Sequence, residues 1–171
     1  DTYIARKVNA IVIAPVSAKN SAAALKRARD AGITVVAVNG GLTDTSIAQA
    51  TFSTSNKDLG ISTGKAAAAF IKETLSGKAN VAILGFKSLL PEQSGDRTGG
   101  FKDAAAEGGN QIKIIAEQDA WLPEKAVSVA TDILTANPDV NVIYAANEGG
   151  TVGAMQAVRN AGKSGSVYVF G

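Results

Sequence analysis

Seven short apolar runs recur along the chain, and segments with apolar residues at helical spacing lie between most of them. The runs occupy residues 9–16, 33–38, 47–53, 80–86, 111–117, 141–146 and 166–171. They are continuously apolar rather than alternating, which is typical of strands that are buried on both faces of a parallel sheet. The pattern therefore predicts seven strands, most of them parallel to their neighbours.

Helical spacing of apolar residues predicts helices over residues 21–32, 56–77, 122–138 and 149–162, with a weaker one over 96–109. Several of these segments end at a glycine, which is common just after the last residue of a helix. Pro123 lies in the first turn of one segment, where proline is favoured. Gly99 and Gly100 weaken the helix predicted over 96–109. Strands that alternate with helices in this way indicate an α/β fold with parallel sheets flanked by helices.

The alternation breaks once, where residues 39–53 join two strands without a helix. We place the passage between two lobes there, which divides the chain into residues 1–54 and 55–171. The last run, "SVYVFG", ends the sequence with no helix after it. We therefore expect a fragment, incomplete at both ends, with exposed strand edges and uncovered apolar surface.

Composition excludes several kinds of chemistry. The 171 residues are 46% hydrophobic and 19% charged, and 17 basic against 15 acidic residues give a net charge of +2. The basic residues are scattered, so we expect neither nucleic acid nor an anionic membrane surface as a partner. The chain has no Cys and no His, which excludes thiol nucleophiles and every triad that needs imidazole. No apolar run approaches the roughly 20 residues of a membrane span.

Ligands of open α/β sheets bind beyond the carboxyl ends of the strands, so residues that follow each run are the candidates for a site. Asn147 follows the run over 141–146 and offers donors and an acceptor to a pair of hydroxyls, or caps the next helix. Arg97 is predicted at a helix start, where the helix dipole opposes a cation, so a ligand or a surface ion pair must explain it. Trp121 lies in a polar stretch after a strand, which favours stacking on a ligand over core packing.

Two further positions are less specific. Asn39 begins the sequence "NGG" directly after a strand, which fits a plain turn or an amide that faces a ligand. Glu148 is more simply a first-turn charge that the helix dipole favours. Without an imidazole or a thiol, no residue offers a base near neutral pKa, so we do not expect an enzyme.

The stretches "VNAIVIAPVSAKNSAAALKRARDAGITVVAVN", "DRTGGF" and "NPDVNVIYAANEGGTVGAMQAVRNAGKSGSVYVFG" resemble a known family. They are similar to periplasmic sugar-binding proteins of the ribose-binding type, the capture components of bacterial ABC importers. The resemblance covers essentially the whole chain and implies two Rossmann-like lobes of a type I periplasmic binding protein. "DRTGGF" is similar to an Arg-x-x-Gly-Phe turn of that family. Ligand-binding domains of lac-repressor-type regulators share the fold and several of the motifs.

The resemblance implies a ligand cleft between the lobes and gives each candidate residue a role. Arg97 matches the family's ligand-binding arginine, Trp121 its stacking aromatic and Asn147 its hydroxyl-binding amide. Asn39 stands where the family commonly has an Asp, and Gly40 where ribose binders have an Arg. These two departures make ribose itself a poor expectation.

We therefore expect a non-catalytic solute-binding component of an ABC importer that captures a small neutral sugar or polyol and delivers it to a permease. The alternative is the effector-binding domain of a lac-repressor-type regulator. The importer hypothesis implies a location in the periplasm or otherwise outside the cytoplasmic membrane, with or without a lipid anchor. It implies no cofactor, no metal, no nucleic acid and no direct insertion into the membrane.

Overall fold

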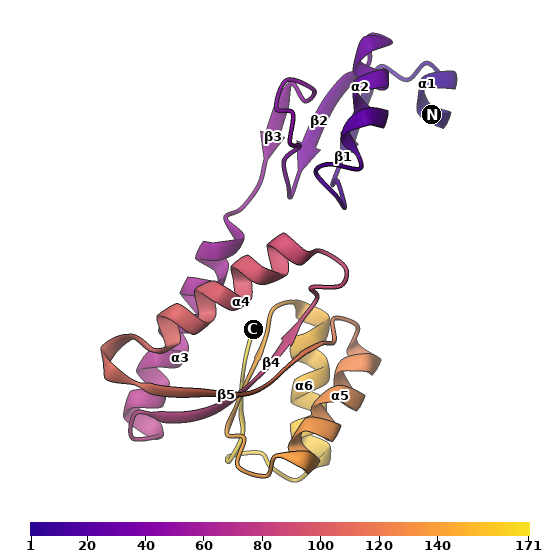
Figure 1. Ribbon diagram of the computed structural model, residues 1–171. Helices are drawn as coiled ribbons and strands as arrows, with labels where there is room; N and C mark the ends of the chain where they lie inside the picture. Colours follow the sequence, from indigo (N-terminus) through magenta and orange to yellow (C-terminus); the bar gives the residue numbers. More distant parts are fainter. The chain divides into compact units, whose positions relative to one another are not determined.

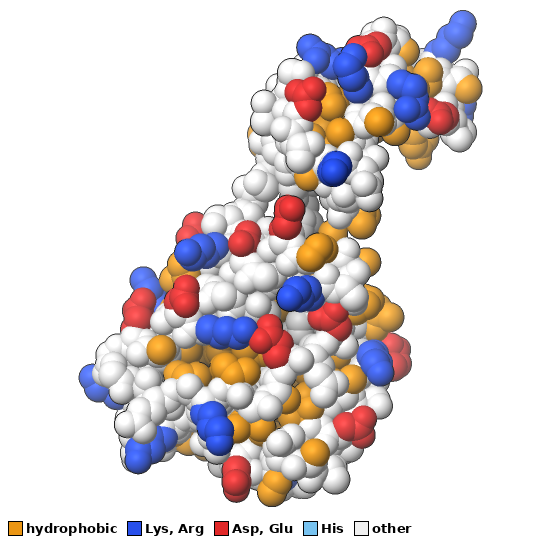
Figure 2. All heavy atoms as spheres, in the orientation of Figure 1, with side chains coloured by type: hydrophobic (Ala, Val, Ile, Leu, Met, Phe, Trp, Pro, Cys, Tyr) orange, Lys and Arg blue, Asp and Glu red, His pale blue; other side chains and the backbone are white.

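The computed structural model describes residues 1–171, which form two compact units, Asp1–Ser55 and Asn56–Gly171. The sequence pattern placed this boundary between residues 54 and 55. Both units are built from parallel strands and helices (Figure 1), which confirms the predicted α/β class. Figure 2 shows basic and acidic side chains interspersed over the visible surface of each unit, in agreement with the scattered charges of the sequence.

The first unit is a three-stranded parallel sheet in the order β1-β2-β3. Its elements are α1 (Thr2–Ala5), β1 (Ala10–Ile13), α2 (Ala22–Asp30), β2 (Thr34–Val38) and β3 (Ala50–Phe52). Leu25 and Ala28 of α2 are buried in one apolar cluster with Val35 of β2. The sequence pattern did not predict the short helix α1.

The opposite face of this sheet carries exposed apolar side chains. Val12 is 69% exposed and Phe52 is 65% exposed. Both belong to the same face, because Val12 pairs with Val36 and Phe52 pairs with Val38, two residues further along the same strand. This face agrees with the expectation of uncovered apolar surface.

The second unit has three layers, with a four-stranded parallel sheet in the order β5-β4-β6-β7 between two pairs of helices. Its strands are β4 (Lys78–Gly85), β5 (Gln111–Asp119), β6 (Val142–Ala145) and β7 (Tyr168–Phe170). Its helices are α3 (Asn56–Thr74), α4 (Pro91–Ala105), the 3₁₀ turn η1 (Glu107–Gly109), α5 (Pro123–Ala136) and α6 (Glu148–Asn160). All seven predicted strands are present, with ends that differ by up to three residues.

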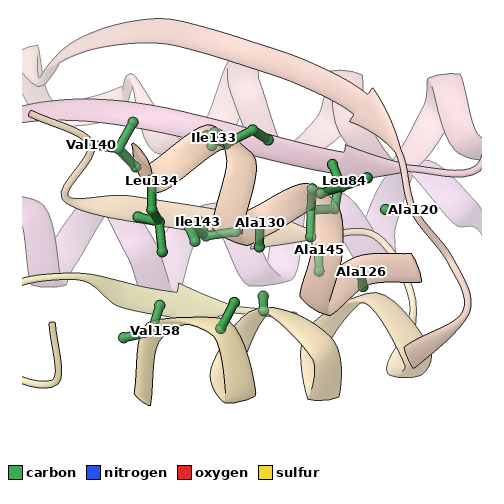
Figure 3. Packing of buried hydrophobic residues seen from close by; sticks show 14 of the residues in the cluster. Leu84, Ala120, Ala126, Ala130, Ile133, Leu134, Val140, Ile143, Ala145 and Val158 are labelled. Carbon is green, nitrogen blue, oxygen red and sulfur yellow. The ribbon is translucent and has the colours of Figure 1, made fainter. Parts of the chain in front are cut away.

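Successive residues of the central strand β4 face opposite layers, as the period of two requires. Val81 and Ile83 are buried against α3 and α4, whereas Ala82 and Leu84 are buried against α5 and α6. Figure 3 shows the second of these cores, where side chains of α5 and α6 meet those of the sheet. Burial on both faces explains why the runs that form β4 and β6 are continuously apolar.

The helix predicted over 96–109 begins earlier and ends earlier than expected. Pro91 starts α4 in the first helical turn, where its missing N–H costs nothing, and the helix stops at Ala105. The glycines that weakened the prediction lie inside the helix, and Gly100 has a packing role. A Cβ at Gly100 would lie 2.4 Å from the carbonyl oxygen of Lys57 in α3, so only glycine permits this approach.

Candidate functional site

Three loops meet at one edge of the second unit's sheet. The strand β4 ends at Gly85, which pairs with Asp119 at the end of β5, and Leu84 pairs with Ala145 at the end of β6. Because the strands are parallel, the residues that follow all three lie along the same edge. These residues include Phe86, Trp121 and Asn147.

Arg97 reaches this edge from the middle of α4. The prediction that it lies at a helix start is wrong, because α4 begins six residues earlier, at Pro91. The "DRTGGF" stretch is likewise helical and not a turn. The Arg97 Nη1 atom donates a hydrogen bond of 2.8 Å to the carbonyl oxygen of Ala146, directly after β6. The side chain therefore joins the candidate site although its backbone does not follow a strand.

Two further contacts hold the Arg97 guanidinium. Its Nε atom donates to Oδ1 of Asn56 at 2.8 Å, and its central carbon lies 5.4 Å from the ring centroid of Phe86. No carboxylate lies within ion-pair distance of Arg97, since the three ion pairs of the chain involve other residues. This excludes the surface ion pair that the sequence left open. The contacts to Asn56 and Ala146 use two of the five guanidinium N–H groups and leave the other three unused.

The close packing of α3 and α4 brings Asn56 and Arg97 together. A Cβ at Gly60 would lie 2.1 Å from the carbonyl oxygen of Arg97, and one at Gly64 would lie 2.7 Å from that of Phe101. Asn56, Gly60 and Gly64 lie four residues apart, on one face of α3. The glycines let the two backbones touch, and Asn56 then extends to the Arg97 side chain.

Asn147 caps α6 and ties it to the loop that follows β5. Its Oδ1 atom accepts from the Gly150 N–H at 3.2 Å, and its Nδ2 atom donates to the Trp121 carbonyl oxygen at 3.0 Å. The capping role that the sequence allowed is thus present. These two bonds leave one N–H and one lone pair of the amide unused. Glu148 is the exposed first residue of α6, in agreement with a first-turn charge.

Trp121 is partly buried and packs against the apolar cluster between the sheet and helices α3 and α4. Its carbonyl oxygen is engaged by Asn147, and a Cβ at Gly149 would lie only 2.2 Å from that oxygen. The loop backbone is therefore fixed against the start of α6. A fixed backbone restricts where the indole can lie, as a stacking surface requires.

Asn39 belongs to the first unit and directly follows β2. Its backbone has a φ of 61°, in the left-handed region that Asn tolerates better than most residues. Its N–H donates to the Phe52 carbonyl oxygen at 2.8 Å. This geometry accounts for an Asn in the turn and leaves its role toward a ligand as a prediction.

Tyr144 is a buried phenol close to Arg97. Burial raises the pKa of Tyr144 to about 12, although the positive charge of Arg97 acts in the opposite direction. The Tyr144 ring stacks on Phe101, with centroids 4.0 Å apart, and its hydroxyl points to the Arg97 carbonyl oxygen at 3.5 Å. Tyr144 therefore stays a neutral donor under α4 at any physiological pH.

A separate groove of about 910 Å³ is lined by residues of α4, of the end of β5 and of the loop after β4. Its wall includes Asp119, whose carboxylate accepts from the N–H groups of Lys87 at 2.7 Å and Ser88 at 2.5 Å. Burial raises the pKa of Asp119, but hydrogen bonds from Ser88 and Lys87 outweigh it and hold the pKa below the usual value. The groove contains none of the predicted site residues. Asp119 instead fixes the loop between β4 and α4.

Sequence reasoning missed Asn56, Phe86 and the Ala146 carbonyl, which hold Arg97 in place. Each acts through a contact between segments far apart in the chain, so no local pattern marks it. The only sequence signal for this arrangement is the spacing of four residues between Asn56 and Gly60, which places both on one face of the predicted helix. No group of His, Cys or acidic side chains is placed to hold a metal ion, and no helix combines the length and apolar character of a membrane span.

Comparisons with known proteins agree with this fold. The family model described as "Periplasmic binding protein domain" matches residues 1–171. The chain is 34% identical over 181 residues to the D-ribose/D-allose-binding protein of Pseudomonas aeruginosa, covering 100% of this chain and 53% of that protein. It is 29% identical over 174 residues to the ABC transporter periplasmic-binding protein YphF of Escherichia coli, again covering 100% of this chain and 53% of the relative.

A solved structure shows the same fold. A periplasmic solute-binding protein of an ABC transporter from Actinobacillus succinogenes, with bound D-allose, superposes with a TM-score of 0.83 at 35% identity. The match covers 98% of this chain and 59% of that one. The chain thus spans about half the length of the curated relatives it matches. With its whole length matched by the family model, the chain belongs to the periplasmic binding protein family.

Proposed function

We propose that the protein is the solute-binding component of a bacterial ABC importer and captures a small neutral sugar or polyol without converting it. The observation that carries the proposal is the held guanidinium of Arg97 at the carboxyl edge of the sheet, beside Ala146 and close in sequence to Asn147. Membership of the periplasmic binding protein family supports it. The YphF relative and the Actinobacillus succinogenes structure are named as binding proteins of ABC transporters, which favours this class over a lac-repressor-type regulator.

The chemistry of the edge suits polyhydroxylated ligands. Arg97 offers three N–H donors, and the Asn147 amide offers one donor and one acceptor. The indole of Trp121 presents an apolar face, which matches the C–H face of a sugar ring. Asn39 is proposed as a further contact, with an amide where the resemblance expects a carboxylate. The chain has no His and no Cys to act as a base or nucleophile beside these groups, so we propose binding without chemical conversion.

The first experiment is calorimetric titration of the full-length protein with D-allose, D-ribose and a panel of other pentoses, hexoses and polyols. Arg97→Ala should weaken the best interaction by ten-fold or more, because a hydrogen bond to a charged group contributes about 1.5–3 kcal/mol. Arg159→Ala is the matched control, since Arg159 is exposed in the last turn of α6. Equal affinity of parent and Arg97→Ala would remove Arg97 from the site, and no binding by the parent would reject the sugar class.

The importer role has its own test. A permease is the expected partner, and the protein is expected outside the cytoplasmic membrane, with or without a lipid anchor. Deletion of the gene should abolish high-affinity uptake of the sugar identified by calorimetry, and the intact gene should restore it. Unchanged uptake in the deletion strain would contradict a transport function.

A further inference from the structure

The Nε atom of Arg97 donates to Oδ1 of Asn56, an amide outside the site predicted from sequence. We propose that Asn56 is a positioning residue, which sets the direction in which Arg97 presents its remaining donors to the sugar. The inference rests on the proposed function, since it assigns Asn56 a part in the same site. It concerns specificity and affinity, and Asn56 acts through Arg97 and not through the ligand.

Hydrogen bonds at two different nitrogens fix both the position and the plane of a guanidinium. Nε is held by Asn56 at 2.8 Å and Nη1 by the Ala146 carbonyl oxygen at 2.8 Å. The Phe86 ring, 5.4 Å from the central carbon, supports the group further. The three N–H groups that remain therefore point in defined directions before any ligand arrives. Pre-ordering a long side chain in this way removes an entropic cost from binding.

The hydrogen bond between Asn56 and Arg97 depends on the close packing of α3 and α4, which requires a glycine inside α3. Asn56 lies one helical turn before Gly60, and Gly60 lies against the Arg97 carbonyl oxygen. Glycine inside a helix is less favourable than alanine, so this close approach is kept against helix propensity. Asn56 is also the first residue of α3 and of the second unit, directly after residues 53–55.

A purely structural role for Asn56, as a residue that suits a helix start, makes a different prediction. Serine has a helix propensity similar to that of asparagine, so it is tolerated in the first turn of α3, but its hydroxyl is too short to reach Nε of Arg97. Aspartate suits a helix start and keeps an oxygen at the Oδ1 position. Asn56→Ser therefore separates helix stability from positioning, and Asn56→Asp keeps both. Asn80→Ser is the matched control, because the Asn80 amide also joins distant segments, donating to the Asp139 carbonyl oxygen.

The full-length protein and these three variants would be titrated with D-allose, or with the strongest binder of the sugar panel. We expect Asn56→Ser to weaken binding by about tenfold with an unchanged melting temperature, and Asn56→Asp to stay within about threefold of the parent. Asn80→Ser should leave the affinity unchanged. Equal affinity of Asn56→Ser and parent, or the same loss in Asn56→Asp as in Asn56→Ser, would overturn the proposal.

A second measurement does not depend on a sugar. In ¹⁵N spectra the Arg97 Nε–H should exchange slowly with water in the parent and in Asn56→Asp, and quickly in Asn56→Ser. Fast exchange in the parent would overturn the positioning role even if sugars bind. Slow exchange in a parent that binds no sugar would leave the contact in place and reject only the proposed function.

Discussion

Replacing Gly60 by alanine should force helices α3 and α4 apart. A Cβ at this position would lie 2.1 Å from the carbonyl oxygen of Arg97 and 2.9 Å from its carbonyl carbon. Both are backbone atoms of a packed helix and cannot turn aside as the end of a flexible side chain can. To bring the shortest distance from 2.1 Å to the 3.0 Å that real contacts require, the helices must separate by 3.0 − 2.1 = 0.9 Å.

The cost follows from two opposing terms. Forcing an extra methyl group into a packed interior costs about 1–3 kcal/mol, and backbone against backbone belongs at the upper end of that range. Alanine returns up to about 1 kcal/mol through its better helix propensity. The net loss is therefore about 2 kcal/mol, the upper end of the packing cost less the gain in helix propensity. At roughly 2–4 °C per kcal/mol, the melting temperature should fall by about 4–8 °C.

Gly99→Ala is the matched control for this substitution. Gly99 also lies inside a helix of the same pair, but a Cβ there meets nothing within 4 Å. This variant should unfold at the parent midpoint or above it, with a gain of up to about 1 kcal/mol. Urea unfolding followed by circular dichroism measures both variants in the full-length protein. A parent-like midpoint for Gly60→Ala would refute the close-packing argument, and equal losses in both variants would attribute the effect to the helices in general.

Three further predictions concern individual side chains. Trp121→Ala should weaken sugar binding about 30-fold in calorimetry, since burial of a large aromatic contributes about 1.5–3 kcal/mol, and Trp121→Phe should recover part of it; unchanged affinity would make the indole a packing residue only. Asn147→Ala should lower the free energy of unfolding by about 1 kcal/mol through loss of the helix cap. Asn147→Ser should recover that stability, but not the sugar affinity measured by titration. Burial raises the pKa of Asp119, but hydrogen bonds from Ser88 and Lys87 hold it below its usual value. The ionised carboxylate therefore stabilises the fold at a pH above the unfolded pKa. This contribution disappears as pH falls through the folded pKa. The urea midpoint should therefore drop more steeply below pH about 4 in the parent than in Asp119→Asn, and parallel curves would contradict this assignment.

The roles of Asn147 and Arg97 depend on where the fold places them. Asn147 was predicted as a helix cap, a ligand contact or both, and the structure confirms the cap while the ligand contact stays a prediction. Arg97 was predicted from a helix start that does not exist, yet its side chain reaches the end of β6. Pro91 starts the helix six residues before Arg97, so the helix dipole does not oppose the cation there, and no apolar pattern marks residues 91–95 as helical.

The sequence by itself determined the fold class and the strands, because parallel strands covered on both faces must be apolar throughout and so differ visibly from amphipathic helices. It also determined which residues follow strands, since strand ends are local features. Only the tertiary structure decided what holds Arg97. Asn56 and Arg97 are separated by 41 residues and meet because Gly60 and Gly100 allow two backbones to touch. A glycine in a sequence does not show whether it serves a turn, a close contact or open space, because that depends on atoms from another part of the chain.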